Sequence, residues 1–335
     1  MNDFSCSSFS WETEDNKHLL GRTYDQFGDL NGNVIAIVPR NYELSSLINS
    51  KSIFKVKYLF GGMCIKGLET PLLVDGINEK GLMGALLRYP GFAVYDTQKR
   101  PGIMDINPGF LVTYILSVCE NIEEVCKEIK NINLCSEKVF GNEIPVHYIF
   151  SDKSGKTIIV EPDKEEIKIH NENIGVLTNS PNYKWHEQNI RNYVSSKNIL
   201  DNKQNICGKE FKDFGFSGLH LPGSYSSVDR FIRVALLKEF TFKGKNEIDG
   251  ISKMFQNFSS VEVPMGVIGI KIAGVEEFQS TLCISCMCSE SLTYYFSLIN
   301  NRRINAIDLN KEINNSELKF IDLPNDQDIL YLNWS

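Results

Sequence analysis

The sequence lacks the features of a membrane-spanning or secreted protein. None of its 335 residues lie in an apolar run close to the ~20 residues that a membrane span needs. The first five residues, Met-Asn-Asp-Phe-Ser, contain neither the basic nor the apolar segment of a secretory signal. Basic residues are also not in excess, since 35 Lys and Arg against 42 Asp and Glu give a net charge of −7. We therefore expect a cytoplasmic protein with no membrane and no nucleic-acid partner.

Paired cysteines are not evident either. The nine cysteines are odd in number and widely scattered, which favours reduced thiols in a chain without an export signal. The tightest group is Cys283, Cys286 and Cys288, whose flanks predict a strand with Cys286 and Cys288 on one face and Cys283 on the other. A zinc site also needs a fourth ligand and usually a second pair at matched spacing. We expect buried strand thiols here, and neither a metal nor another cofactor.

The composition is that of an ordinary globular protein, with 42% hydrophobic and 23% charged residues. No shift in composition marks a linker and no repeat is visible, so a single domain is expected. Alternation predicts strands, and apolar spacing after capping residues predicts helices, with Asn121 as one cap and either Ser226 or Ser227 as another. Strands are expected at 6–12, 34–38, 53–60, 157–161, 166–169, 281–288 and 292–298, and helices at 108–119, 121–129, 226–238 and 248–258. This order indicates an α+β fold with antiparallel sheets.

Two segments are expected to lie outside this framework. Residues 188–223 are polar and glycine-rich, and loops of this length usually serve function or assembly. Residues 322–335 are typical of a poorly ordered or docked tail.

The chemistry of the chain centres on Cys6. If residues 1–5 were removed, Cys6 would carry both a thiol and a free α-amino group. An α-amino group titrates at about 7.7–8.0, against roughly 10.4 for a lysine, so it can act as a general base near neutral pH. One residue would then supply both the nucleophile and its base.

Five ordered stretches extend this hypothesis to nearly the whole chain. They are Cys6 to Asp25, Asp75-Gly76-Ile77-Asn78-Glu79-Lys80-Gly81-Leu82, Gly175-Val176-Leu177-Thr178-Asn179-Ser180-Pro181, Leu221-Pro222-Gly223 with Arg230 to Arg233, and Arg303-Ile304-Asn305-Ala306-Ile307-Asp308. With them, the sequence resembles the choloylglycine hydrolases, which comprise conjugated bile acid hydrolases and penicillin V acylases. The resemblance implies a four-layer αββα N-terminal nucleophile hydrolase fold, with two antiparallel sheets between two helical layers.

The resemblance also implies a catalytic set. Cys6 is the expected nucleophile, with Arg22 and Asp25 against its thiol and amine. A cation beside the sulfur lowers the thiol pKa, and a carboxylate orients the amine. Asn179 is expected to donate to the tetrahedral oxyanion, and Arg230 to balance charge. No metal takes part in this set.

Arg88 departs from the family pattern, which has asparagine or tyrosine at this position. The family uses the backbone N–H of this residue in the oxyanion hole, so a different side chain need not abolish catalysis. The guanidinium either meets an anionic group of the substrate, as its fork geometry suits, or is an exposed arginine at the pocket rim.

The expected cleavage of the N-terminal residues also bears on the prediction of the substrate class. We expect residues 1–5 to be a leader, cleaved from the 6–335 domain by attack of the Cys6 thiol on the Ser5 carbonyl. The leader, together with local matches around 81–85 and 39–42, favours a penicillin V acylase-like amidase. Conjugated bile acid hydrolase and N-acyl homoserine lactone acylase remain the alternatives. The partners expected are a small amide substrate and, as in the family, copies of the same chain in a homotetramer, with contacts in 188–223.

Two other classes of protein remain open. A thiol hydrolase with His147 or His186 as its base is compatible with the spacing, although neither histidine lies in a recognisable motif. A catalytically silent binding member of the fold is the second, against which the presence of the whole catalytic set argues.

Overall fold

The structure is a computed structural model. It describes residues 5–46, 53–68, 70–96, 98, 102–139, 141–164, 166–199, 203–212, 220–272, 274–324 and 326–332. Most of the expected leader, parts of the 188–223 segment and the end of the tail lie outside the described residues.

Two antiparallel sheets form the centre of the described part of the chain. The first contains seven strands: β1 (Cys6–Glu12), β2 (His18–Phe27), β15 (Val176–Leu177), β18 (Ile268–Ile272), β19 (Val275–Cys288), β20 (Thr293–Leu298) and β21 (Asn301–Asp308). The second contains nine: β3 (Asn33–Val38), β6 (Phe60–Ile65), β7 (Leu72–Leu73), β8 (Asp75–Asn78), β9 (Met83–Arg88), β12 (Val146–Ser151), β13 (Thr157–Pro162), β14 (Ile167–His170) and β22 (Lys319–Asp322). Their orders are β15-β1-β2-β19-β20-β21 with β18 on β19, and β14-β13-β12-β9-β8-β6-β3-β22 with β7 on β6.

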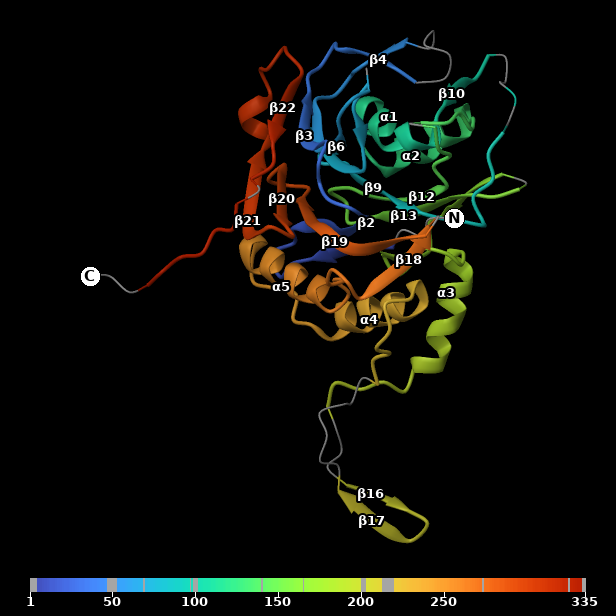
Figure 1. The fold of residues 1–335 in the computed structure, drawn as a ribbon, viewed down its shortest axis with the longest axis vertical. Helices are drawn as coiled ribbons and strands as arrows, with labels where there is room; N and C mark the ends of the chain where they lie inside the picture. Colours follow the sequence, from blue (N-terminus) through green and yellow to red (C-terminus); the bar gives the residue numbers. More distant parts are fainter. Residues whose placement is uncertain are drawn as a thin grey trace.

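Helices cover the outer faces of both sheets (Figure 1). The helix α1 (Leu111–Val118) packs on β8 and β9, with α2 (Ile122–Glu128) beside it in the same layer. On the other side, α4 (Ser227–Phe240) packs on β1 and α5 (Glu247–Ser259) on β2 and β19, with α3 (Tyr183–Asn189) next to them. The sheets also contact each other, through β1 and β2 against β9. The predicted four-layer αββα fold is therefore confirmed.

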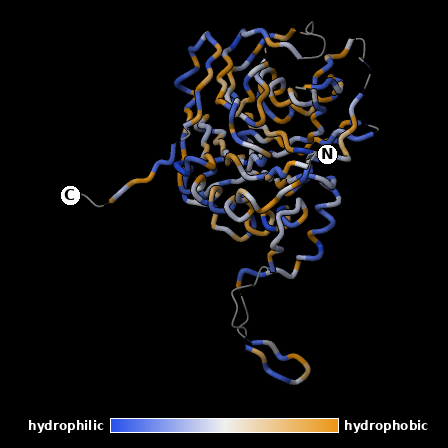
Figure 2. The backbone as a smooth tube through the Cα atoms, in the orientation of Figure 1, coloured by the Kyte–Doolittle hydropathy of each residue, from blue (hydrophilic) through white to orange (hydrophobic). Residues whose placement is uncertain are grey.

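Hydropathy explains this layering. Figure 2 shows apolar stretches gathered in the central strands, with polar stretches toward the outside. The buried strands β3 and β9 have almost no exposed side chains, as expected for strands covered on both faces. Cys283, Cys286 and Cys288 are all buried in β19, as predicted.

Capping residues set the predicted helix starts. Asn121 accepts a hydrogen bond from the Glu124 N–H at the start of α2, and Ser226 accepts one from the Asp229 N–H at the start of α4. Both are N-caps, since their side-chain oxygens satisfy donors that the helix leaves unpaired. The expected helix at 108–119 consists of a 3₁₀ turn (Pro108–Phe110) followed by α1.

The single strand predicted at 53–60 is wrong. A short β5 (Ile53–Lys55) pairs with β4 (Glu43–Ser45), and β6 begins only at Phe60. Between them the N–H groups of Lys57 and Tyr58 both bond the Ser117 carbonyl, so this stretch leaves the sheet for the end of α1.

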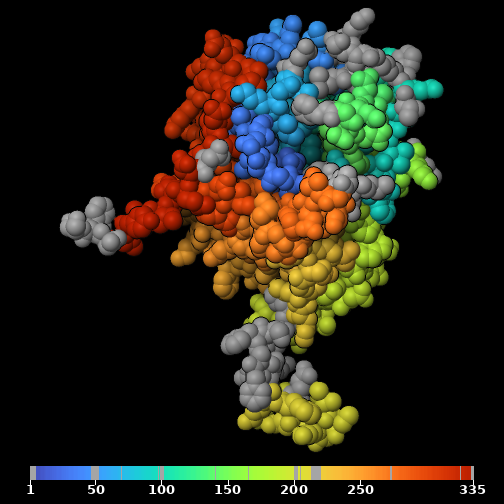
Figure 3. All heavy atoms as spheres, viewed as in Figure 1, coloured from blue at the N-terminus to red at the C-terminus, as the bar shows by residue number. Residues whose placement is uncertain are grey.

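The 188–223 segment is not a plain loop. Residues 188–189 end α3, a 3₁₀ turn follows at Ile190–Tyr193, and β16 (Lys203–Ile206) pairs with β17 (Lys209–Lys212) in a hairpin that stands away from the body (Figures 1 and 3). The described part of the tail beyond Asp322 contains no helix or strand. The remaining pair, β10 (Met104–Ile106) and β11 (Ile132–Leu134), is parallel. In the described chain, no helix is long and apolar enough to span a membrane.

Candidate active site

The site begins at the first residue of β1. The thiol of Cys6 is buried, and Arg22 Nη2 donates to its sulfur at 2.8 Å. Antiparallel pairing of β1 with β2 places Tyr24 opposite Cys6 and Arg22 opposite Ser8, so a short hairpin brings the cation to the sulfur. Burial alone would lower the Arg22 pKa, but negative charge at Cys6 and Asp75 raises it, which keeps the guanidinium protonated.

Asp75 lies behind Arg22 in β8. Its Oδ2 is 3.7 Å from Arg22 Nη1, and both side chains are about 1% exposed. Tyr294 donates its hydroxyl to Oδ1 at 2.5 Å and Ser285 donates to Oδ2 at 2.9 Å. Burial raises the pKa of Asp75, while Arg22 and these donors oppose that shift. A buried carboxylate therefore lies near Nη1 of Arg22, whereas Nη2 donates to the thiol.

Asp25 has one oxygen satisfied and one without a partner. Its Oδ1 accepts from the Thr281 hydroxyl at 2.7 Å, while no described group hydrogen-bonds to the buried Oδ2. Burial raises the pKa of this carboxyl, and the charges of Arg230 and Arg22 oppose that shift. Asp25 thus keeps one acceptor available next to the Cys6 strand.

Asn179 joins three parts of the site. Its Oδ1 accepts from the Cys6 backbone N–H and from Arg230 Nη2, both at 2.7 Å. Its Nδ2 donates to the Arg88 carbonyl at 2.8 Å, which occupies one of the two amide hydrogens. Residues 176–177 form β15 against β1, and this pairing brings Asn179 to the start of β1.

Arg230 lies in the first turn of α4 and is fully buried. Its Nη1 donates to the Cys6 carbonyl at 2.5 Å and to Ser7 Oγ at 2.7 Å, and its Nε donates to the Tyr225 carbonyl at 3.0 Å. Burial lowers its pKa, and the charges of Asp25 and Cys6 oppose this. Five expected site residues therefore converge on one point: Cys6, Arg22, Asp25, Asn179 and Arg230.

The backbone of Arg88 also contacts these residues, because its carbonyl accepts a hydrogen bond from the Asn179 side chain. Its side chain is half-buried, and its positive charge acts on the buried Tyr95 phenol. The residues described as lining the adjoining cavity include Pro90 and Gly91 but not Arg88. A contact between its guanidinium and substrate stays a prediction.

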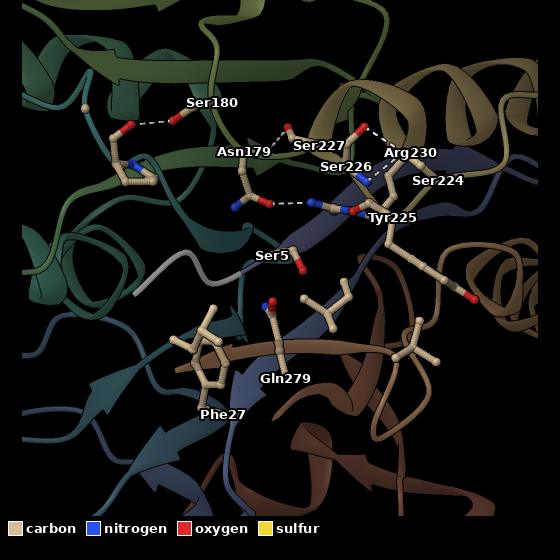
Figure 4. A pocket seen from close by; sticks show the side chains of 15 residues that line it. Ser5, Phe27, Asn179, Ser180, Ser224, Tyr225, Ser226, Ser227, Arg230 and Gln279 are labelled. Atoms are coloured by element: carbon tan, nitrogen blue, oxygen red, sulfur yellow. Dashed lines mark hydrogen bonds between the residues drawn. The ribbon is translucent and has the colours of Figure 1, made fainter. Parts of the chain in front are cut away.

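A cavity of about 770 Å³ adjoins these residues (Figure 4). Ser5 lies in it, between Asn179 and Gln279, with Phe27 at the lower side of the view. The lining combines apolar side chains with hydroxyl and amide groups: Ser5, Phe27, Pro90, Gly91, Asn179, Ser180, Ser224, Tyr225, Ser226, Ser227, Arg230, Val267, Ile268, Ile270 and Gln279. Ser5, which directly precedes Cys6, is therefore part of the cavity lining.

The two histidines considered as bases lie elsewhere. The ring of His147 bonds the Thr178 carbonyl and that of His186 the Asn179 carbonyl, and the described contacts of both rings do not include the Cys6 thiol. The structure thus gives no support to a Cys–His pair. No cluster of three or more metal-ligating side chains occurs among the described residues.

No role in the site was predicted from the sequence for Asp75, Ser227 or Gln279. Asp75 lies inside one of the five stretches, which was the available signal for it. Ser227 donates to or accepts from Thr178 and accepts from the Asn179 N–H, contacts between segments that no local pattern encodes.

Comparison with known proteins identifies the family. The profile of the linear amide C–N hydrolases, choloylglycine hydrolase family, matches residues 6–321. The chain belongs to this family. It is accordingly a hydrolase that acts on linear amides.

The relatives are mainly bile salt hydrolases. A bile salt hydrolase/transferase from Clostridium perfringens is 33% identical over 94% of this chain and 95% of its own length. One from Lactiplantibacillus plantarum is 29% identical over 92% and 93%. A crystal structure of a mutant conjugated bile acid hydrolase from Clostridium perfringens superposes with a TM-score of 0.89 at 32% identity, covering 98% of this chain and 100% of that one.

A penicillin V acylase is a more distant structural neighbour. The acylase structure from Agrobacterium tumefaciens gives a TM-score of 0.75 at 22% identity, covering 97% of this chain and 94% of that one. At this identity the likeness shows the shared fold alone. The expected preference for an acylase-like specificity is therefore not what the comparisons favour.

Proposed function

We propose that the protein hydrolyses conjugated bile acids, with Cys6 as an N-terminal nucleophile after removal of residues 1–5. The observation that carries this proposal is the set of contacts around Cys6: Arg22 on its sulfur, Asn179 on its nitrogen and Arg230 on its carbonyl oxygen. The bile salt hydrolase relatives support the choice of substrate over penicillin V.

The cavity supports the same substrate class. A bile acid presents a large rigid apolar face and a hydroxylated face. The lining offers Phe27, Val267, Ile268 and Ile270 for the first, with serine hydroxyls and Gln279 for the second. Burial of apolar surface supplies most of the binding free energy, while the polar groups fix orientation.

The proposed reaction has two halves. The Cys6 α-amine takes the proton of the thiol and becomes an ammonium, and the thiolate attacks the amide carbonyl. The oxygen that becomes negative accepts a hydrogen bond from Asn179. The C–N bond then breaks as the Cys6 α-ammonium gives a proton to the departing amine. Water, deprotonated by the same α-amine, attacks the thioester and releases the carboxylic acid and the thiol.

Maturation prepares this base. In the uncleaved chain the Cys6 nitrogen is an amide, already bonded to Asn179 Oδ1. Cleavage converts it to an amine with further hydrogens, and the unpartnered Oδ2 of Asp25 is a buried acceptor suited to orient it. Removing Ser5 would also clear the space that it fills between Asn179 and Gln279 (Figure 4). The match of the family profile from residue 6 onward supports cleavage at this bond.

The test compares glycocholate and penicillin V hydrolysis by purified protein, with Cys6→Ala as the blank and intact mass to establish cleavage. Faster release of glycine than of 6-aminopenicillanic acid is the expected result. A preference for penicillin V would restore the acylase assignment. No turnover of either by cleaved protein would contradict both and direct attention to other N-acyl amides, such as N-acyl homoserine lactones.

A further inference from the structure

Two buried histidines hold the chain segment that carries Asn179. Nε2 of His147 is 2.8 Å from the Thr178 carbonyl oxygen, and Nε2 of His186 is 3.0 Å from the Asn179 carbonyl oxygen. A carbonyl oxygen only accepts, so each Nε2 carries a hydrogen and donates it. Both rings are fully buried. Two consecutive carbonyls are therefore fixed by rings that come from different elements.

The ring of His147, from β12, is oriented on three sides. Its Nδ1 lies 3.3 Å from Glu161 Oε1, and its face stacks on Tyr89 with centroids 4.3 Å apart and planes at 10°. Tyr89 directly follows Arg88, whose carbonyl accepts from the Asn179 side chain. The ring of His147 thus contacts two segments next to Asn179. It bonds the carbonyl of the preceding residue, Thr178, and it stacks on the residue that follows Arg88, the partner of the Asn179 side chain.

Glu161, on β13, is the anchor of this ring. It also accepts from His170 Nε2 at 2.9 Å and from the Tyr183 N–H at 2.8 Å. Burial would raise its pKa, but the hydrogen bonds from His147 and His170 outweigh this and lower it to about 2. The carboxylate therefore stays ionised across the neutral range, which fixes the acceptor for His147.

The ring of His186, from α3, is held by stacking. It lies 4.5 Å from the Phe231 ring at 15°, and Phe231 follows Arg230 in α4. No described group hydrogen-bonds to its Nδ1. Desolvation lowers the pKa of this imidazole to about 4, so the ring is neutral near pH 7 and its one hydrogen is on Nε2. Nδ1 then carries only a lone pair, and Nε2, which is 3.0 Å from the Asn179 carbonyl oxygen and 3.5 Å from Ser227 Oγ, is the single donor of the ring.

We propose that His147 and His186 are positioning residues for the oxyanion donor. By fixing the carbonyls of Thr178 and Asn179, they set the direction in which the Asn179 side chain leaves the backbone. That direction matters because a donor must already point at the developing charge before reaction. This inference rests on the proposed function, because it concerns the residues that orient one hydrogen-bond donor, Asn179, in that reaction.

The kinetic test uses paired variants. His147→Leu and His186→Leu remove the Nε2 donor, whereas His147→Gln and His186→Gln retain a donor at similar reach. We expect each leucine variant to lower kcat for glycocholate by about tenfold or more, below the roughly 10²–10³ lost with a complete oxyanion donor, while KM stays near wild type. The glutamine variants should recover most of the rate.

Controls separate positioning from folding. His18→Leu is the matched control, because His18 bonds Glu290 through a partly buried ring at the start of β2 and should keep the wild-type kcat. Alkylation of Cys6 by iodoacetamide should proceed at the wild-type rate in all variants, since that reaction needs no oxyanion donor. Equal losses in the leucine and glutamine variants would overturn the inference, as would a parallel loss of alkylation.

A second readout does not depend on turnover. In protein labelled with ¹⁵N-asparagine, the Asn179 side-chain amide is assigned by its disappearance in Asn179→Ser. It should give one sharp, exchange-protected pair in the wild type and the glutamine variants, and a shifted or multiple signal in the leucine variants. An unchanged signal in both leucine variants would overturn the inference. If glycocholate is not hydrolysed at all, the proposed function fails while this measurement still decides the role of the histidines.

Discussion

At the scale of single residues, the site is a balance of buried charges around one sulfur. Arg22 and Arg230 both bond Cys6, while Asp25 and Asp75 lie buried beside them. Burial raises the pKa of each carboxyl group, and the positive charge of a neighbouring arginine opposes that rise. A single buried charge without a partner would be costly in free energy, so each of these four groups depends on the others for compensation of its charge.

Asp75→Asn tests this balance. The substitution leaves the guanidinium of Arg22 buried without its carboxylate, and we expect the free energy of unfolding to fall by about 3–5 kcal/mol. Ser285→Ala is the control, since it removes one hydrogen bond to the same carboxylate and should cost roughly 1–3 kcal/mol. Urea unfolding measures both. Equal costs would show that the charge of Asp75 contributes little.

The pKa of His186 predicts how stability depends on pH. Its value in the folded protein, about 4, lies below the 6.5 of an unperturbed histidine. Between these values the unfolded chain binds the proton and the folded chain does not, so stability is full above about pH 6.5 and falls by up to about 3 kcal/mol toward pH 4.

His186→Gln should remove this contribution, because glutamine does not titrate. We expect the difference in unfolding free energy between about pH 7 and pH 4.5 to be smaller in the variant than in the wild type. Urea unfolding at the two pH values measures it. The same difference in both proteins would contradict the assigned pKa.

At the scale of elements, close packing of β2 depends on a residue without a side chain. A Cβ at Gly21 would lie 2.8 Å from each of Cys286 Sγ, Phe258 Cε2 and the Ser285 carbonyl oxygen. Gly21 therefore lets α5 and β19 approach β2 one residue before Arg22.

Gly21→Ala should be destabilising, because two of these contacts belong to a buried ring and a strand backbone that cannot move freely. Overpacking of this kind costs about 1–3 kcal/mol or more. Gly223→Ala is the matched control, since a Cβ there meets nothing within 4 Å. A thermal melt of each variant checks the expectation, and equal melting temperatures would refute it.

The elements also show what a sequence can and cannot specify. Local signals sufficed for the N-cap at Asn121 and placed the start of α4 at Ser226 or Ser227, of which Ser226 is the cap. Alternation failed at 53–60, because the chain turns toward Ser117, a contact far along the sequence. The five sequence stretches that resemble the family include the residues that contact Cys6. His147 and His186 lie outside them and bond the carbonyls of Thr178 and Asn179, which belong to another segment. Their roles follow from tertiary contacts and could not be deduced from spacing.

At the scale of the whole molecule, two parts extend from the body. Figure 3 shows the β16–β17 hairpin below it and the C-terminal tail at its side. The tail exposes four consecutive apolar residues, Ile329 to Leu332, each at least 64% exposed. The hairpin exposes Ile206 and Phe211. Apolar side chains that extend from the body are costly unless another surface covers them.

A two-stranded hairpin is marginally stable by itself in water. It lies in the 188–223 segment, and subunit contacts of a homotetramer in this segment stay a prediction. We therefore expect Ile206→Asp combined with Phe211→Asp to lower the mass of the assembly in solution, because two charges would be placed in an apolar contact. Phe242→Asp is the control: Phe242 lies just beyond the end of α4 and is 84% exposed, and this variant should have the wild-type mass. Light scattering after size-exclusion chromatography gives the mass. A wild-type protein that elutes as a monomer would contradict the tetramer, and a double variant of unchanged mass would place the subunit contacts away from the hairpin.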